Sequence, residues 1–197
     1  MLQLEKISTI VSGISFRALG AGSTRFMRLA DLTDIKAGRI PALAMGERPA
    51  VARALMIEEG DLVIGARGDV TEVCVAENYL TGAFISLDLY LVRPNPSFVD
   101  PHYLAAFLEL PTTQAALSGG KQGTGLARLA KEALAKTEIP LPPMPQQRLI
   151  AGLAQSYEQE ARLLKQLANL SSFFGREAVS RAILAADTEH NFTRSAQ

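Results

Sequence analysis

The stretch Ile139-Pro140-Leu141-Pro142-Pro143-Met144-Pro145-Gln146-Gln147 separates two parts of the chain that differ in pattern. Proline has no backbone N–H and a fixed φ angle, so this stretch is predicted to be a stiff, extended spacer. Pro145 suits the first position of a helix, because that position needs no intrahelical donor. The sequence therefore predicts a globular part before the spacer and a helix after it.

The residues after the spacer are predicted to form one long helix with an apolar stripe. The stripe consists of Leu149, Leu153, Leu163, Leu167, Leu170 and Phe174. Steps of three and four residues are those of a coiled-coil seam, although Ser156 and Glu160 interrupt it. A helix over 145–186 would span roughly 60 Å, which one compact domain does not cover. We expect the stripe to pack against a second copy in an antiparallel homodimer, or against a partner's helices; the alternative is a monomer whose helix folds back on its own domain.

Three segments before the spacer are predicted to be strands, because apolar residues dominate each one and turn residues bound it. They are Asp61–Ala66, Thr71–Ala76 and Ala83–Arg93. Asp100 as N-cap and Pro101 as first residue predict the start of a helix. Strands and helices in one domain indicate the α+β class.

The remaining segments carry mostly loop signals. Ala30–Pro49 is rich in turn residues and is predicted to lack a helix. Ser118–Gly125 is predicted to be a Gly-rich loop, and Ala127–Leu134 a short helix that follows it. Pro111 is expected to interrupt the helix that begins at Pro101.

Composition points to a single cytoplasmic domain with an extension. The chain has 197 residues, of which 48% are apolar, enough for a substantial core. It contains no apolar run long enough to span a membrane and no signal-peptide pattern at its start. The single cysteine, Cys74, cannot form an internal disulfide and is predicted to be a small buried residue.

The formal charge is zero, but its distribution is uneven. Residues 1–57 hold eight Lys/Arg and four Asp/Glu, and residues 111–150 hold five and two. The intervening 58–110 holds two and nine. If the fold brings the two basic segments together, a positive surface forms on a neutral protein; the alternative is ordinary scattered charge.

No set of residues predicts a catalytic, metal or cofactor site. His102 and His190 have no ligands at metal-binding spacing. Asn95-Pro96-Ser97-Phe98 lies near the Asn-Pro-Pro-aromatic loop of amino-methyltransferases, but Ser97 replaces a proline. A turn that closes a strand is the favoured interpretation of this segment.

Cationic and polar residues make the candidate DNA contacts. The Gly-rich loop would allow close approach to a phosphate, and its polar residues are Lys121, Gln122 and Thr124, with Arg128 next to it. Arginine binds guanine edges and phosphates with two parallel hydrogen bonds. This makes five more residues candidates: Arg17, Arg25, Arg28, Arg39 and Arg67. For each of them, a solvated surface arginine is the alternative.

Several of these motifs occur together, in order, in one protein family. The chain resembles the specificity subunits of type I restriction-modification systems over about 1–170. The similar segments are Ile10–Arg17, Arg28–Leu32, Gly38–Ile40, Gly60–Ile64, Arg67–Gly68, Asp100–Leu104, Gly119–Leu134 and, most specifically, Ile139–Gln147. Gln146 stands where the family usually has glutamate. A typical family member has two recognition domains and two long helices, and this chain has room for one of each.

The resemblance implies a target-recognition domain with a twisted mixed β-sheet and a long C-terminal coiled-coil helix. We expect the recognition domain over 1–142, a spacer and docking helix over 143–187, and a disordered tail over 188–197. It also implies binding to double-stranded DNA, with a methyltransferase (modification) subunit and a restriction subunit as partners and no catalysis by this chain. The alternatives are an interaction protein that kept the fold without DNA binding, and an adenine-specific methyltransferase fragment.

Overall fold

The computed structural model describes residues 1–17, 22–50, 54–122 and 127–195, and these divide into two units. The first is Met1–Gln155 and the second Ser156–Gln197. The boundary therefore lies inside the long helix α6 (Met144–Ser195), 13 residues after the boundary expected at 142. None of the helices in the described part of the chain has both the length and the apolarity that crossing a bilayer requires.

The first unit is centred on a four-stranded antiparallel sheet with the strand order β2-β8-β5-β6. Its strands are β2 (Ser8–Ser12), β5 (Leu62–Gly65), β6 (Val73–Val75) and β8 (Leu89–Pro94). Alternate residues of β5 belong to two different cores: Leu62 and Ile64 to one, Val63 to the other. Because both faces of the sheet are covered, this strand is apolar throughout instead of alternating.

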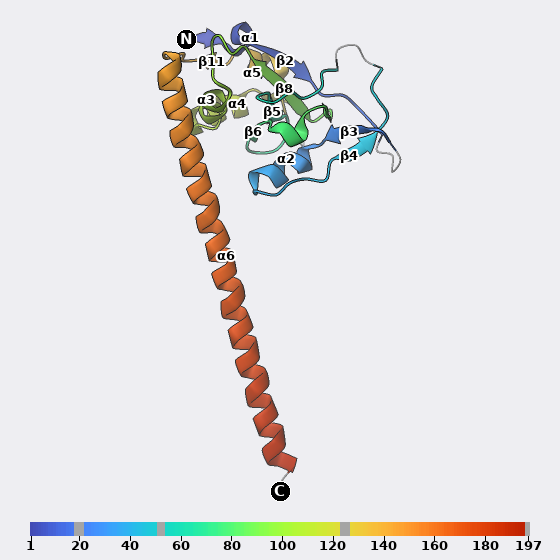
Figure 1. Ribbon diagram of the computed structural model, residues 1–197, viewed down its shortest axis with the longest axis vertical. Helices are drawn as coiled ribbons and strands as arrows, with labels where there is room; N and C mark the ends of the chain where they lie inside the picture. The colour runs from blue at the N-terminus through green and yellow to red at the C-terminus, as the bar shows by residue number, and fades with distance from the viewer. Residues whose placement is uncertain (18–21, 51–53, 123–126, 196–197) are drawn as a thin grey trace. The chain divides into compact units, whose positions relative to one another are not determined.

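Helices cover the two faces of this sheet (Figure 1). One core includes residues of α1 (Leu4–Ile7), α3 (Pro101–Leu108), α4 (Pro111–Gly119) and α5 (Lys131–Ala135). The other includes Leu32 of α2 (Leu29–Lys36) and Leu80 of the short 3₁₀ helix η1 (Asn78–Leu80). Cys74 lies in this second core and is buried, as predicted.

Smaller sheets complete the unit. β3 (Thr24–Met27) pairs antiparallel with β4 (Ala44–Gly46) and parallel with β7 (Phe84–Ile85). β1 (Leu2–Gln3) pairs with β11 (Glu138–Ile139), and β9 (Lys121–Gln122) with β10 (Arg128–Leu129). The α+β class, the mixed strand directions and the long C-terminal helix are confirmed.

Two sequence predictions for the N-terminal half are wrong. The predicted strand 83–93 is two strands, β7 and β8, because the chain turns between them and Leu89 N–H donates to Ser86 O at 3.0 Å. The 30–49 region, predicted to lack a helix, contains α2. The N-cap of α2 is Arg28, which is not a usual capping residue. The carboxylate of Asp31 supplies the capping hydrogen bond, because it accepts from Arg28 N–H at 2.7 Å.

Of the predictions nearer the C-terminus, one needs correction. As predicted, the helix that begins at Pro101 does not continue through Pro111: α3 ends at Leu108, and Pro111 is the first residue of the next helix, α4, where a proline is tolerated. The helix expected over 127–134 is β10 followed by α5, because Arg128 and Leu129 pair with β9. Helix α6 is described as far as Ser195, which includes most of the range 188–197 for which a disordered tail was predicted.

The spacer is not helical and is held at one end by a buried side chain. Residues 140–143 have no helical structure, and α6 begins at Met144, one residue before the predicted start. Gln147 is 2% exposed, and its amide bonds the backbone of Asp100, Phe98 and Pro142. The start of α6 is thereby fixed to the N-cap of α3.

Candidate nucleic-acid interface

The hairpin β9–β10 is attached to the ends of two central strands. Leu129 N–H donates to Ala66 O at 2.8 Å, and the Tyr90 hydroxyl donates to Leu129 O at 2.6 Å. Leu129 and Tyr90 are both buried. The hairpin is therefore positioned by the core, whereas the segment 118–125 was predicted to be only a Gly-rich loop.

Two arginines from distant parts of the chain share one carboxylate beside this hairpin. Arg67 Nε lies 2.6 Å from Asp88 Oδ1, and Arg128 Nη1 lies 3.5 Å from the same oxygen. The Arg128 guanidinium also lies over the Tyr90 ring, 5.2 Å from its centroid, a cation–π contact. The side chains of Arg67, Asp88 and Arg128 are each about one third exposed, so the group is accessible from solvent.

Lys121 adds a third cation to this group. Its Nζ donates to Gly68 O at 2.6 Å and to Asp69 O at 2.8 Å. Gly68 has a φ of +101°, which favours glycine at this position of the loop. We call Arg67, Asp88, Lys121 and Arg128 the hairpin cluster; it carries three positive charges and one negative charge.

Three of the predicted DNA-contact residues thus come together, while two others fall outside the structural description. Thr124 lies outside the described residues, as does the side chain of Gln122. Asp88 and Tyr90 were missed by sequence reasoning. The sequence signal for a turn was Asp88, an acidic residue inside an otherwise apolar segment. Its neighbour Leu87 is 48% exposed in the structure.

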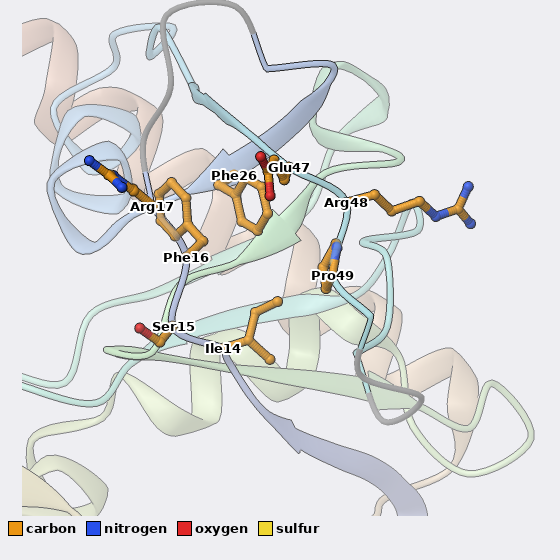
Figure 2. Close-up of a pocket in the computed structure, with 8 residues that line it drawn as sticks. All are labelled: Ile14, Ser15, Phe16, Arg17, Phe26, Glu47, Arg48 and Pro49. Carbon is orange, nitrogen blue, oxygen red and sulfur yellow. The ribbon is translucent and has the colours of Figure 1, made fainter.

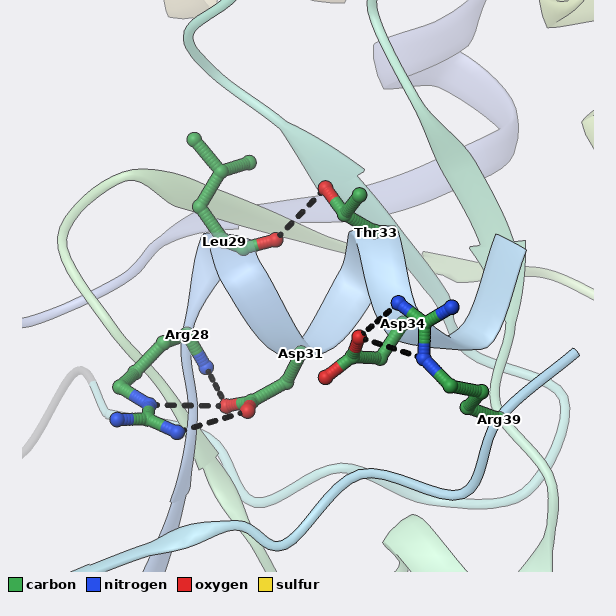
Figure 3. A network of polar contacts seen from close by, with 6 residues as sticks. All are labelled: Arg28, Leu29, Asp31, Thr33, Asp34 and Arg39. Carbon is green, nitrogen blue, oxygen red and sulfur yellow. Dashed lines mark hydrogen bonds and ion pairs between the residues drawn. The ribbon is translucent and has the colours of Figure 1, made fainter. Parts of the chain in front are cut away.

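The other predicted arginines make contacts within the fold instead of joining the hairpin cluster. Arg28 forms an ion pair with the buried Asp31 at 2.9 Å, and Arg39 forms an ion pair with Asp34 (Figure 3). The two aspartates lie on α2, and the two arginines flank this helix. The hydrogen bond to Asp31 raises the pKa of Arg28 above its usual value. Arg25 donates to the carbonyls of Tyr79 and Thr81 at 2.9 and 2.5 Å. These contacts stabilise α2 and the turn that contains η1.

Arg17 borders a separate cavity of about 330 Å³. The rings of Phe16 and Phe26 stack there with centroids 4.1 Å apart, and Arg17 and Arg48 point away from each other on either side of the stack (Figure 2). The rest of the lining is Ile14, Ser15, Glu47 and Pro49. The volume is at the lower end of small-molecule sites, which span roughly 300–1,000 Å³.

The methyltransferase-like segment forms a turn. Asn95 Oδ1 accepts from Ser97 N–H at 3.0 Å, and Asn95 O accepts from Phe98 N–H at 3.0 Å, directly after β8. The Asn95 side chain is therefore engaged in the local backbone. Within the described ranges, no group of three or more His, Cys, Asp or Glu residues is arranged to hold a metal ion.

The stripe on α6 consists of exposed side chains. Leu149 and Leu153 in the first unit are 74% and 73% exposed. In the second unit, whose only described element is the helix, Leu163, Leu167, Leu170 and Phe174 are between 54% and 65% exposed. Large exposed apolar side chains along one side of a helix are typical of a partner surface.

Comparisons with known proteins place this architecture. The family model described as "Type I restriction modification DNA specificity domain" matches residues 52–170. No match to a curated protein was found. Similar solved structures include the HsdS subunit from Thermoanaerobacter tengcongensis, with 23% identity and a TM-score of 0.56 over 84% of this chain and 38% of that chain.

Two more solved structures have the same fold. The type I restriction-modification S subunit from M. genitalium has 12% identity and a TM-score of 0.57, covering 84% of this chain and 40% of that one. A structure described as the basis of complex assembly and conformational transition of the type I R-M system has 22% identity and a TM-score of 0.61, covering 84% and 39%. The chain thus spans about two fifths of the length of these relatives.

Proposed function

Because the chain belongs to the type I restriction-modification DNA specificity family, we propose that it is a DNA-recognition subunit that selects the sequence at which a methyltransferase acts. The observation that carries this proposal is the hairpin cluster, which lies inside the matched region. It brings together two cations of the β9–β10 hairpin and one from the loop after β5, each partly exposed, on a protein with zero net charge. Such a local positive surface is what a nucleic-acid contact requires.

The chain is proposed to recognise DNA without catalysing a reaction. The Asn95 segment, which was the basis for the methyltransferase alternative, has its side chain engaged in a turn. The partners proposed are double-stranded DNA, a modification subunit and, where one is encoded, a restriction subunit. Methyl transfer or cleavage by the purified chain, abolished by a change at Asn95, would contradict this.

We further propose that two copies associate through the α6 stripe. The chain spans about two fifths of each solved relative, so two copies approximate the length of one. A two-fold antiparallel arrangement would bury the apolar row of each helix against its own copy and supply two recognition domains. The bound target would then be a palindrome with a central spacer. Helices of a modification subunit would compete for the same stripe.

Binding to a pool of randomised duplexes tests the proposed function. The full chain, alone and with a modification subunit, is mixed with the labelled pool at low salt, and bound duplexes are recovered and sequenced over several rounds. We expect enrichment of one sequence motif. No binding at low salt in either mixture would contradict the proposal.

An interaction protein that does not bind DNA is the second candidate. It is favoured by the pairing of the cluster's cations: both arginines contact Asp88, and Lys121 is bonded to two carbonyls. In that case the stripe on α6 would remain functional while the hairpin cluster would only stabilise the fold. The same selection distinguishes the two, because the interaction protein would enrich no motif.

A further inference from the structure

We propose that Asp88 is a positioning residue that orients Arg128 to read a base edge, whereas Lys121 supplies charge toward a phosphate. This rests on the proposed DNA-recognition function and assigns different roles within the hairpin cluster. The observation behind it is the contact of Arg67 and Arg128 with the same oxygen of Asp88. Asp88 occupies the turn between β7 and β8, which sequence patterns did not single out.

Arg128 is held on two sides. Its guanidinium lies over the buried Tyr90 ring, and the Tyr90 hydroxyl is fixed by its bond to Leu129 O. Asp88 approaches its Nη1 from the turn between β7 and β8, and this turn is anchored because Asp88 O accepts from Ala66 N–H at 2.8 Å. A guanidinium whose plane and direction are both restricted loses little rotamer freedom when it binds.

The contact with Asp88 leaves Arg128 able to accept a new partner. At 3.5 Å the Arg128–Asp88 contact is longer than the Arg67–Asp88 contact of 2.6 Å. Among the described residues, the Arg128 side chain makes no further polar contact, and it is 27% exposed. A planar donor pair held in one orientation matches the two acceptors O6 and N7 of guanine in the major groove.

Lys121 differs from Arg128 in this respect. Its ammonium group is a compact charge bonded to the carbonyls of Gly68 and Asp69, and it lacks the fork geometry that distinguishes one base from another. Phosphate contacts of this kind fix the position of a protein on a duplex but carry no sequence information. The structure therefore assigns sequence reading to the side of the cluster that Asp88 organises.

The test compares four proteins in the same duplex selection: wild type, Asp88→Asn, Asp69→Asn and Arg128→Lys. Asp69 is exposed and lies in the same loop as Arg67, so Asp69→Asn removes the same charge without touching Arg128. Binding to the selected duplex, to single-base variants of it and to a random duplex is then measured by fluorescence anisotropy across a salt series. Urea denaturation of each variant measures whether it is folded.

We expect Asp88→Asn to lose about tenfold or more of the preference for guanine at one position, while its affinity for random duplex rises. Arg128→Lys should lose the same preference and keep the wild-type salt dependence, because its charge remains. Asp69→Asn should raise affinity for every duplex alike and leave the preference unchanged.

Three results would overturn the inference. One is a wild-type preference retained by Arg128→Lys, which leaves Asp88 untouched and so remains informative if Asp88→Asn does not fold. Another is an equal loss of preference in Asp69→Asn, which would mean that net charge alone is responsible. A wild type that enriches no motif would remove the proposed function and this inference with it, and that result is seen in the wild-type arm alone.

Discussion

The side-chain oxygen Oε1 of Gln147 accepts the backbone N–H of Asp100 at 2.9 Å, although 47 positions separate the two residues. Asp100 is the N-cap of α3, and its own carboxylate accepts from His102 N–H and Tyr103 N–H. The Nε2 group of Gln147 donates to Phe98 O and Pro142 O. One buried amide thus joins the start of α6, the spacer and the cap of α3.

Replacing this amide should destabilise the first unit. Gln147→Ala leaves three partly buried backbone groups without their partner, and we expect a loss of about 3 kcal/mol in the free energy of unfolding. Urea denaturation followed by circular dichroism measures it. Gln146→Ala is the control, because Gln146 is the exposed neighbour on the same turn. Equal losses in the two variants would contradict the role assigned to Gln147.

Gly13 should be intolerant of any side chain. A Cβ built there would lie 1.9 Å from Ser86 O and 2.9 Å from Ile85 O, both backbone atoms that cannot move independently of the sheet. Gly13→Ala is expected to cost about 2 kcal/mol or more of stability by overpacking. Gly119→Ala, at the end of α4 with no atom within 4 Å, should be neutral or stabilising. The measurement is the denaturant midpoint of unfolding of each variant, compared with that of the wild type.

The thiol of Cys74 should be unreactive in the folded protein. Burial raises its pKa to about 12, so the neutral thiol persists up to that pH and the reactive thiolate is scarce at pH 8. We expect a thiol reagent such as Ellman's reagent to react slowly at pH 8 and rapidly when urea is added. Rapid reaction without denaturant, at the rate of a free cysteine, would show that the core around Cys74 opens readily.

Lys121→Ala should weaken DNA binding without changing its sequence preference. If Lys121 contacts one phosphate, the negative slope of log K against log salt concentration becomes shallower by about one in this variant. The comparison is with Lys6→Ala, which removes the same charge from a side chain that is 64% exposed on α1, outside the hairpin cluster. An unchanged slope in Lys121→Ala would remove this residue from the interface.

Charges introduced into the α6 stripe should dissociate the proposed homodimer. The double variant Leu163→Glu with Leu167→Glu places two carboxylates in the seam, where an antiparallel copy would bring like charges together in an apolar contact. Sedimentation equilibrium at micromolar concentration should give a dimer for the wild type and a monomer for this variant. The control, Asn169→Glu with Ser172→Glu, puts the same charges on other helix faces and should stay dimeric. A monomeric wild type would refute the homodimer.

The sequence alone determined the features that depend on neighbouring residues. Proline density at 140–145 predicted a spacer before the long helix, the Asp100-Pro101 pair predicted the start of α3, and three- and four-residue spacing predicted the long helix and its stripe. The apolar segment Asp61–Ala66 predicted the strand that is observed as β5. These signals are local, because backbone sterics, capping and helical periodicity act over a few residues.

Tertiary structure decided what joins residues far apart in the chain. Charge patterning suggested that the basic segments 1–57 and 111–150 would meet, but the fold instead placed Arg67, which belongs to the acidic segment 58–110, with Arg128 on one oxygen of Asp88. It directed Arg28 and Arg39 to α2. The turn at Ser86–Leu89, which carries Asp88, depends on β7 pairing with β3 while β8 pairs with β2 and β5. Strand partners are chosen by burial on both faces of the sheet, and no local pattern encodes which distant strand supplies that burial.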